Sequence, residues 1–487
     1  MASAASARRA ELRQNPTAGP LAAAGVFFFL AAALTYRADV SLWLSHHHAH
    51  VIEKALLVLD RGRLELIGFF YPPLPFLLML SWPSPVFAGL LAAGCGAGLV
   101  WILTRELSCL PFPRPASFGL LLGLATPTTF FLFTQSLWEA LLLVLLVVAR
   151  TQCVEFVSRG NTRALFIAGL ALGLAFLANY YVLLFTLPYA FTMLLFVRTT
   201  RRGAGVAAAF VLVFPMVATI LGWMYLSWVF TGEPLAFTRD PASSMFAFLK
   251  PDGADLPTGW SAALRATAHD VRMAPVYMVV AVVVAWYRPF RLLTLVVCAV
   301  FVLVLRTFGF VFPDYLATVT FTVVALASLP PRTPRQLWPL LLVTALLQFG
   351  LGWALPLRGE PAAWQNAVTS GEVTPEDREE TAIGQSLNQR PARSVLIDDR
   401  VGYRIIARAG TARPFLTPVD GLYALAVSQP ARFVPSMLAP VGRAHVVEAA
   451  GQSPAGAHPG LRLTRAWSTW CLYESTTSRA TLGPQIR

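Results

Sequence analysis

The sequence predicts a multi-pass α-helical membrane protein with about eleven transmembrane helices and a small C-terminal α/β domain. Its composition points there first: 56% of the 487 residues are hydrophobic, only 13% are charged, and the mean hydropathy is +0.60. Soluble globular chains carry about 25% charged residues. Apolar runs of roughly 17 to 25 residues, the length that a helix needs to cross a bilayer, recur over most of the chain.

The apolar runs define the expected spans in chain order. Two of them are short and are separated only by Arg288-Pro289-Phe290-Arg291, so the number of spans is uncertain by one or two. The expected spans are 20–36, 85–104, 117–133, 137–156, 164–178, 181–197, 204–230, 275–287, 292–305, 311–329 and 337–355.

The arginines of the short loops predict the orientation, because short loops rich in Lys and Arg stay cytoplasmic. If the tail 1–19 lies inside, every short loop with two or more arginines also lies inside. The same alternation places two large loops, 37–84 and 231–274, on the outer side. We therefore expect a transmembrane domain over 20–356 in the cytoplasmic membrane, followed by an outer domain over 357–487.

The segment 357–487 has the composition of an ordinary globular domain. Its alternating helix and strand patterns predict a small α/β domain. Asp398-Asp399 ends the first expected strand, where α/β domains often place binding groups, although a cap for the following helix is the simpler interpretation. Helices are expected over 376–386 and 402–409, and strands over 394–397, 432–434 and 467–473.

Charge and cysteine usage narrow the function classes. The net charge of +13 does not indicate nucleic-acid binding, because the basic residues are mostly topology signals and form no patch interleaved with aromatic residues. Of the five cysteines only Cys471 is expected outside, so the outer domain has no disulfide partner in the chain. The first apolar run lacks a following cleavage pattern and is expected to be an anchor.

The loop 37–84 concentrates groups that can carry chemistry. Four of the seven histidines lie in His46-His47-His48-Ala49-His50, which follows Asp39 and leads into an amphipathic helix over 49–59. Tyr71-Pro72-Pro73-Leu74-Pro75 then ends that element and starts a second short helix. Ionisable groups beside a lipid-embedded span indicate a functional site. A solvated surface run is the simpler alternative for the histidines.

These features resemble the GT-C superfamily of integral-membrane glycosyltransferases, in particular its protein mannosyltransferase and aminoarabinose transferase branch. The resemblance rests on the first span, the long outer loop with its Tyr-Pro-Pro-Leu-Pro motif, the number of spans and the outer domain. The run Gly169-Leu170-Ala171-Leu172-Gly173-Leu174-Ala175-Phe176-Leu177-Ala178 is similar to a Gly-Leu-x-x-Gly-Leu-Ala span of that branch. The resemblance covers most of residues 20–356. It implies a polyprenyl-phosphate sugar donor, transfer on the outer face and inversion of the anomeric centre.

The resemblance also implies an acidic residue in the first loop, upstream of the glycine that ends the first surface helix. Counting back from Gly62 reaches His47 and His48 instead. A neutral imidazole can act as a base or bind a divalent metal ion. Asp39 is the alternative acid, closer to the first span. Either the base has changed identity or catalysis has been lost.

A second acid is implied at the outer end of the fourth span, where Trp138-Glu139 matches in position and type. A carboxylate at the head of an apolar helix is costly unless water, a partner or a ligand meets it. The alternative is a favourable charge at a helix amino terminus, worth under about 1 kcal/mol. We therefore expect Glu139 to be catalytic, together with His47, His48 or Asp39. For the one expected cofactor, a divalent metal ion, the candidate ligands are His48, His50 and Glu139.

Cations in the two outer loops are candidates for binding the donor phosphate. Arginine can bind phosphate with its planar fork, and lysine can bind it as a point charge. Each cation taken singly is more typical of a solvated loop, but as a group they favour an anionic ligand. The expected donor-binding residues are Lys54, Tyr71, Arg239, Lys250 and Arg272.

The sequence therefore predicts a glycosyltransferase that takes a sugar from a polyprenyl-phosphate donor and transfers it to a cell-envelope lipid, glycan or protein. The expected partners are the lipid-linked sugar, membrane lipids, the acceptor and a membrane protein, with no nucleic acid. A non-catalytic subunit for assembly or lipid binding is the first alternative, favoured by the missing first-loop acid. A transporter is the second, disfavoured because the spans carry few buried charges and show no obvious paired interrupted helices or inverted repeat.

Overall fold

The chain divides into two compact units. The computed structural model describes residues 18–67, 71–183, 185–186, 204–236, 259–287, 289–308, 312–330, 333–441 and 460–476. Unit 1 comprises Met1–Tyr36, Phe69–Pro75 and Gly89–Gln365, and unit 2 comprises Arg37–Gly68, Phe76–Ala88 and Asn366–Arg487. Most of the first loop is thus grouped with the C-terminal segment, whereas the sequence predicted that 37–84 belongs to the membrane domain.

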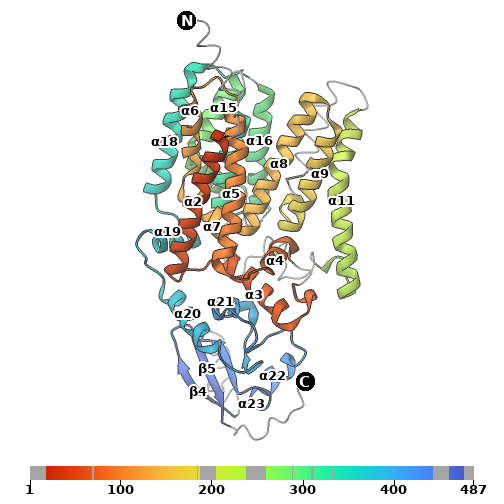
Figure 1. The fold of residues 1–487 in the computed structure, drawn as a ribbon, viewed down its shortest axis with the longest axis vertical. Coiled ribbons are helices and arrows are strands. Elements are labelled where there is room, and N and C mark those ends of the chain that lie inside the picture. Colours follow the sequence, from red (N-terminus) through yellow and green to blue (C-terminus); the bar gives the residue numbers. More distant parts are fainter. Residues whose placement is uncertain are drawn as a thin grey trace. The chain divides into compact units, whose positions relative to one another are not determined.

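Unit 1 is built from apolar helices (Figure 1). Shorter apolar helices are α9 (Thr162–Ala178), α16 (Pro289–Thr307) and α17 (Asp314–Ser328). The multi-pass helical architecture is confirmed, while the count of about eleven spans stays a prediction and the expected span 181–197 lies mostly outside the described residues. In the described part of the chain, the five helices long and apolar enough to cross a membrane are α2 (Ala18–Val40), α5 (Pro85–Leu107), α8 (Leu137–Arg159), α11 (Ala204–Thr231) and η3 with α18 (Arg335–Ala354).

Two pairs of helices are sharply bent, which the apolar pattern did not reveal. The expected span 117–133 is divided among α6 (Arg114–Gly119), η2 (Leu120–Leu124) and α7 (Pro127–Gln135), with a bend of 71°. Thr126 caps α7 and Pro127 occupies its first position, where the missing N–H costs nothing. The second pair, α14 (Trp260–Met273) and α15 (Pro275–Tyr287), bends by 88°. The expected span 117–133 is therefore interrupted, which its continuous apolar pattern did not predict.

Side chains of α18 satisfy the backbone at both bends. Gln348 Nε2 donates to Gly123 O at 2.7 Å, and its Oε1 accepts from Val276 N at 3.2 Å. Trp353 Nε1 donates to Ala125 O at 3.0 Å. Backbone groups freed at a break inside hydrocarbon need partners from the protein, because no bulk water is available there. Gln348 therefore holds the two bent pairs together.

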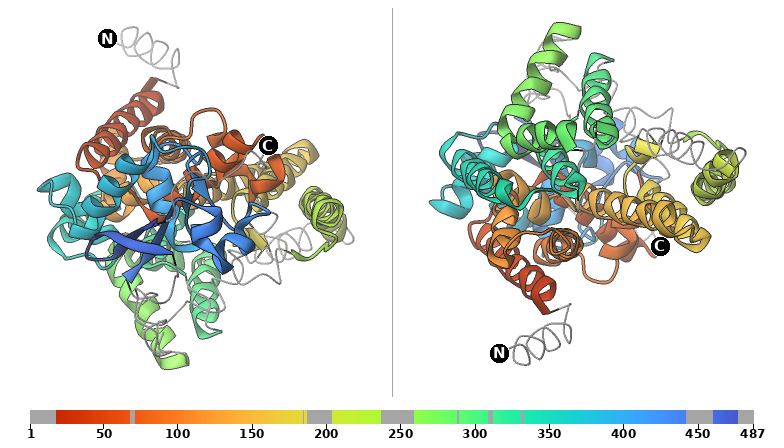
Figure 2. Two further views of the ribbon diagram at one scale, coloured as in Figure 1. Left: turned by 90° about the horizontal axis from the view of Figure 1, so that it is seen from below. Right: turned by 90° about the horizontal axis from the view of Figure 1, so that it is seen from above.

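The glycines of α9 allow close packing against α11. A Cβ at Gly169 would collide with Leu212 O, and a Cβ at Gly173 would lie 2.7 Å from Thr219 Oγ1. Small residues let membrane helices approach closely. Figure 2 shows the helices of unit 1 end-on, with α11 at the edge of the group beside α9. The Gly-Leu-x-x-Gly-Leu-Ala run thus serves helix packing.

Unit 2 contains a five-stranded sheet with the order β2-β1-β3-β5-β4. The first three strands in this order are parallel, and β5 and β4 continue antiparallel. Leu396, Met437 and Tyr473 are buried in its core. The strands are β1 (Val395–Leu396), β2 (Phe415–Leu416), β3 (Ser436–Pro440), β4 (Leu461–Ala466) and β5 (Trp470–Ser475).

Helices complete unit 2, and most of its predicted elements are confirmed. The predicted helices correspond to α20 (Pro375–Leu387) and α21 (Asp399–Ala409). The expected strand over 432–434 is wrong, because Pro430 begins a helical turn and the strand starts at Ser436. The other short helices in the described part of the chain are α3 (His46–Arg61), η1 (Leu64–Ile67), α4 (Pro73–Met79), α19 (Glu360–Thr369), α22 (Tyr423–Ser428) and α23 (Pro430–Phe433).

Replacing Gln348 with leucine should destabilise unit 1 by about 2 to 4 kcal/mol, since it leaves buried backbone groups without a partner at both bends. Thermal unfolding of the purified protein in detergent measures the effect. Gln336→Leu is the matched control, because Gln336 is exposed on η3. An equal melting temperature for Gln348→Leu and wild type would contradict this role.

Candidate functional site

Glu139 is a buried carboxylate at the head of α8, where the sequence predicted it. Only 3% of the surface of Glu139 is exposed. Ser136, which separates α7 from α8, donates a short hydrogen bond from its hydroxyl to Glu139 Oε2. The amino end of a helix favours a negative charge, but only by about 1 kcal/mol. Ser136 therefore both interrupts the helix and orients the carboxylate.

Aromatic residues from three other parts of unit 1 surround this carboxylate. Tyr315, in the first turn of α17, hydrogen-bonds with Ser136 and lies within electrostatic range of Glu139. Tyr181 is also within that range. The ring of Tyr71 lies 6.1 Å from the ring of Trp138, measured between centroids. The candidate site in unit 1 thus combines one buried carboxylate with a largely aromatic lining.

An ion-pair network continues from this site into α14 and α16. Arg306 pairs with buried Asp270 and, at 2.9 Å, with Asp314, the neighbour of Tyr315. Arg306 Nη2 also donates to Phe312 O at 3.1 Å. Two carboxylates hold one guanidinium, so Arg306 joins three helices at the end of unit 1 that carries Glu139. Sequence patterns could not reveal this network, because Asp270 is 36 residues from Arg306 and lies on another helix.

The histidine run forms the first turn of α3 in unit 2. Ser45 caps this helix by accepting from His48 N at 3.0 Å, and Gly62 ends it with a left-handed φ of 64°, as predicted. His46 is exposed and His47 is half-buried, but His48 is buried. A fully solvated run is therefore the wrong description.

Burial sets the protonation states of three side chains on α3. It lowers the pKa of His48 to about 3, and burial together with nearby Lys54 lowers the pKa of His50. Both imidazoles are neutral at neutral pH and weak as bases. Burial raises the pKa of Glu53 to about 8. Among the described residues, His48 Nε2 has no hydrogen-bond partner.

The polar side chains of α3 face α21. His46 Nδ1 lies 2.5 Å from Tyr403 Oη, and the His50 ring meets the same tyrosine edge-on at 5.3 Å. Lys54 Nζ lies 2.9 Å from Asp399 and 3.5 Å from Glu53. Lys54, an expected donor-binding residue, is therefore held inside unit 2 by the Asp399 carboxylate, with the carboxyl group of Glu53 close by. Asp398 caps α21 by accepting from Arg400 N, which matches the simpler interpretation of that pair.

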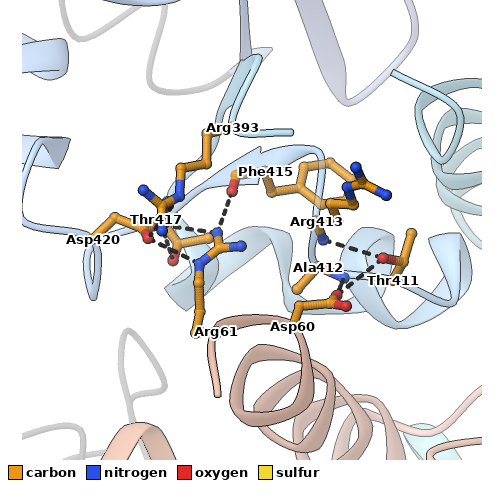
Figure 3. Close-up of polar contacts among 9 residues, drawn as sticks. All are labelled: Asp60, Arg61, Arg393, Thr411, Ala412, Arg413, Phe415, Thr417 and Asp420. Carbon is orange, nitrogen blue, oxygen red and sulfur yellow. Dashed lines mark hydrogen bonds and ion pairs between the residues drawn. The ribbon is translucent and has the colours of Figure 1, made fainter. Parts of the chain in front are cut away.

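The other end of α3 is anchored through Asp60 and Arg61 (Figure 3). Arg61 binds both carboxylate oxygens of Asp420 at 2.9 and 3.1 Å and donates to Phe415 O at 2.7 Å. Asp60 Oδ2 accepts from Ala412 N at 2.6 Å and from Thr411 Oγ1 at 3.0 Å. The first-loop helix is thus fastened at both ends to the C-terminal segment.

The remaining predicted residues are dispersed. Asp39 is half-buried near the end of α2, within electrostatic range of Arg408 in unit 2. Arg272 is exposed on α14, and Arg239 and Lys250 lie outside the described residues. In the described ranges no three His, Cys, Asp or Glu side chains are arranged to hold a metal ion. The metal and donor-binding roles stay predictions.

The fold matches that of a solved glycosyltransferase. The crystal structure of ArnT from Cupriavidus metallidurans bound to undecaprenyl phosphate aligns with 94% of this chain and 99% of that chain, with a TM-score of 0.56 and 13% identity. No protein-family model matches this sequence, and no curated protein matches it. The expected GT-C-like membrane fold is therefore confirmed at the level of the fold.

Glu53→Gln should stabilise the protein most at alkaline pH. Between the ordinary pKa of 4.5 and the folded-state pKa of about 8, the folded chain keeps a proton that the unfolded chain releases, so stability falls as pH rises through this window. Glutamine does not titrate, so the variant removes that loss of stability. Lys54 keeps its ion pair with Asp399. We expect a gain of about 1 to 2 kcal/mol at about pH 8, relative to pH 6.5.

Thermal melts across this range measure the gain. The buried, neutral His48 destabilises the folded protein only as the pH falls below 6.5. It therefore does not affect the change in stability between pH 6.5 and pH 8. Glu372→Gln, at an exposed position of unit 2, is the matched control. A pH profile for Glu53→Gln that parallels wild type would show that Glu53 does not titrate as described.

Proposed function

We propose that the protein is a membrane glycosyltransferase that takes a sugar from a polyprenyl-phosphate carrier and transfers it to a cell-envelope acceptor at the outer face. The observation that carries this proposal is the buried Glu139 in a fold that matches, over 94% of the chain, a structure bound to undecaprenyl phosphate. Burying a carboxylate within a membrane domain costs free energy, so such a residue is expected to have a function.

Glu139 is the proposed general base or acceptor-positioning group. The acceptor nucleophile forms a bond to the anomeric carbon while the bond from that carbon to the phosphate oxygen breaks, which inverts the anomeric centre. Glu139 receives the proton of the acceptor, and the lipid phosphate leaves with the bonding electrons. Ser136 orients the carboxylate through its hydrogen bond. The aromatic lining limits water, which strengthens the electrostatic interactions within the site.

The first-loop residues are proposed to assist, with unequal suitability. His48 is neutral and a weak base, because burial lowers its pKa to about 3. Half-buried His47 and Asp39 are better suited to bind or deprotonate an acceptor. Tyr71, whose ring lies beside Trp138, the neighbour of Glu139 in the chain, is proposed to contact the donor. The same weakness of His48 favours the second candidate function, a non-catalytic subunit that binds lipid or a membrane partner.

Glu139→Gln should reduce turnover by about 100-fold or more, since it removes the proton acceptor while keeping the shape of the side chain. The assay incubates purified protein with radiolabelled polyprenyl-phosphate sugars and envelope acceptors, and counts the transferred label. Glu155→Gln is the matched control on the same helix, because Glu155 lies near the opposite end of α8 and pairs with Arg159.

Two results would contradict parts of this proposal. Wild-type turnover by Glu139→Gln would remove the proposed role of this carboxylate. No transfer by wild type from any donor, together with a stably co-purifying membrane protein, would favour the subunit. His47→Ala and Asp39→Asn, assayed in parallel, separate the first-loop candidates.

A further inference from the structure

Helix α14 has one buried face and one exposed basic face. Arg265, His269 and Arg272 are exposed and follow one another at spacings of four and three residues, which places them on one side of a helix. We call these three residues the basic face. Trp260 and Leu264 are also exposed, at 58% and 47%. The face turned into unit 1 carries Ala262, Ala263, Thr267 and Asp270.

The positive charge of the basic face is not neutralised within α14. Asp270 is the only acidic residue of this helix, and it is buried against Arg306. In the part of the chain that the structure describes, none of the residues of the basic face takes part in an ion pair. The same Asp270–Arg306–Asp314 network fixes the orientation of α14, so its cations are held outward.

The geometry of α14, α15 and α16 places α14 at a membrane boundary. α16 has 19 residues and is about 28 Å long, close to the thickness of about 30 Å of a hydrocarbon core. It starts next to the end of α15 and reaches Arg306, the partner of α14. α15 has 13 residues and is about 20 Å long, so it enters the hydrocarbon core without crossing it. Because α15 turns by 88° from α14, an α15 that enters the membrane leaves α14 along the surface.

We propose that the basic face of α14 binds the phosphate headgroups of anionic bilayer phospholipids. Arginines near an anionic membrane surface attract such lipids, and an amphipathic helix with a basic polar side lies in the interface. Trp260 and Leu264 supply apolar surface for the acyl region, which a soluble anion would not use. This surface is distinct from Glu139 and does not depend on glycosyl transfer. It anchors the end of unit 1 that carries the candidate site.

The test measures lipid binding to the full-length protein. Delipidated protein in neutral detergent is titrated with phosphatidylglycerol or phosphatidylcholine, and native mass spectrometry gives the dissociation constants. Wild type is expected to prefer phosphatidylglycerol by at least about tenfold. R265Q/R272Q should weaken phosphatidylglycerol binding by about 25-fold, because each arginine contributes about fivefold, and should leave phosphatidylcholine binding unchanged.

Two controls keep the result interpretable. R265K/R272K retains the charge and should keep most of the preference. R462Q/R465Q removes two exposed arginines from β4 and should bind phosphatidylglycerol as wild type does. Circular dichroism and melting temperature verify that each variant is folded.

Four outcomes would overturn the proposal. The first two are equal binding of both lipids by wild type and an unchanged preference for phosphatidylglycerol in R265Q/R272Q. The other two are displacement of bound phosphatidylglycerol by inorganic phosphate, and displacement of one bound phosphatidylglycerol molecule by undecaprenyl phosphate. The last would reassign the basic face to the lipid carrier of the sugar. The lipid test contains no glycosyl transfer, so its failure is separate from failure of the transferase assay.

Discussion

Polar groups inside an apolar helical bundle must find their partners within the protein, and this constraint organises unit 1. The two bent pairs exist because α18 supplies Gln348 and Trp353 to the backbone that each bend frees. The interruption at Ser136 places Glu139 at the head of α8 with a hydrogen bond already made. The break between α7 and α8 thus positions Glu139, the buried carboxylate on which the functional proposal rests.

Unit 2 satisfies the same constraint with charges instead of amides. Its first-loop helix α3 carries Glu53, Lys54 and Arg61, all largely buried. Lys54 lies between two carboxylates, and Arg61 is held by Asp420 and a backbone carbonyl. Removing one partner of such a pair leaves an uncompensated buried charge, which costs about 3 to 5 kcal/mol. The histidine run is consequently fixed in place by residues far along the chain.

Much of the membrane architecture could be predicted from the sequence, because apolar length and helix-ending residues are local signals. The ends of α3 at Gly62, of α8 near Leu137 and of α11 near Ala204 follow from such signals. The bends could not be predicted, since 117–133 is apolar on both sides of Pro127. The apolar pattern did not predict helix α14, because this helix lies within a polar loop.

The candidate site was predictable only in part, for a similar reason. Glu139 was recognised because a carboxylate at the start of an apolar run is unusual. Tyr181 and Tyr315 approach it from distant segments, and no spacing in the sequence connects them. The burial of His48 also depends on tertiary contacts, so the sequence alone could not distinguish a base from a neutral buried imidazole.

The most direct test of the account is a photocrosslinking map of the lipid carrier. A diazirine-bearing polyprenyl phosphate is irradiated with the purified protein, and the labelled peptides are identified by mass spectrometry with and without excess unlabelled lipid. The account predicts competable labelling of peptides that contain Ser136 to Glu139, Tyr181 or Tyr315. Labelling confined to lipid-facing helices such as α11, unaffected by competitor, would contradict it.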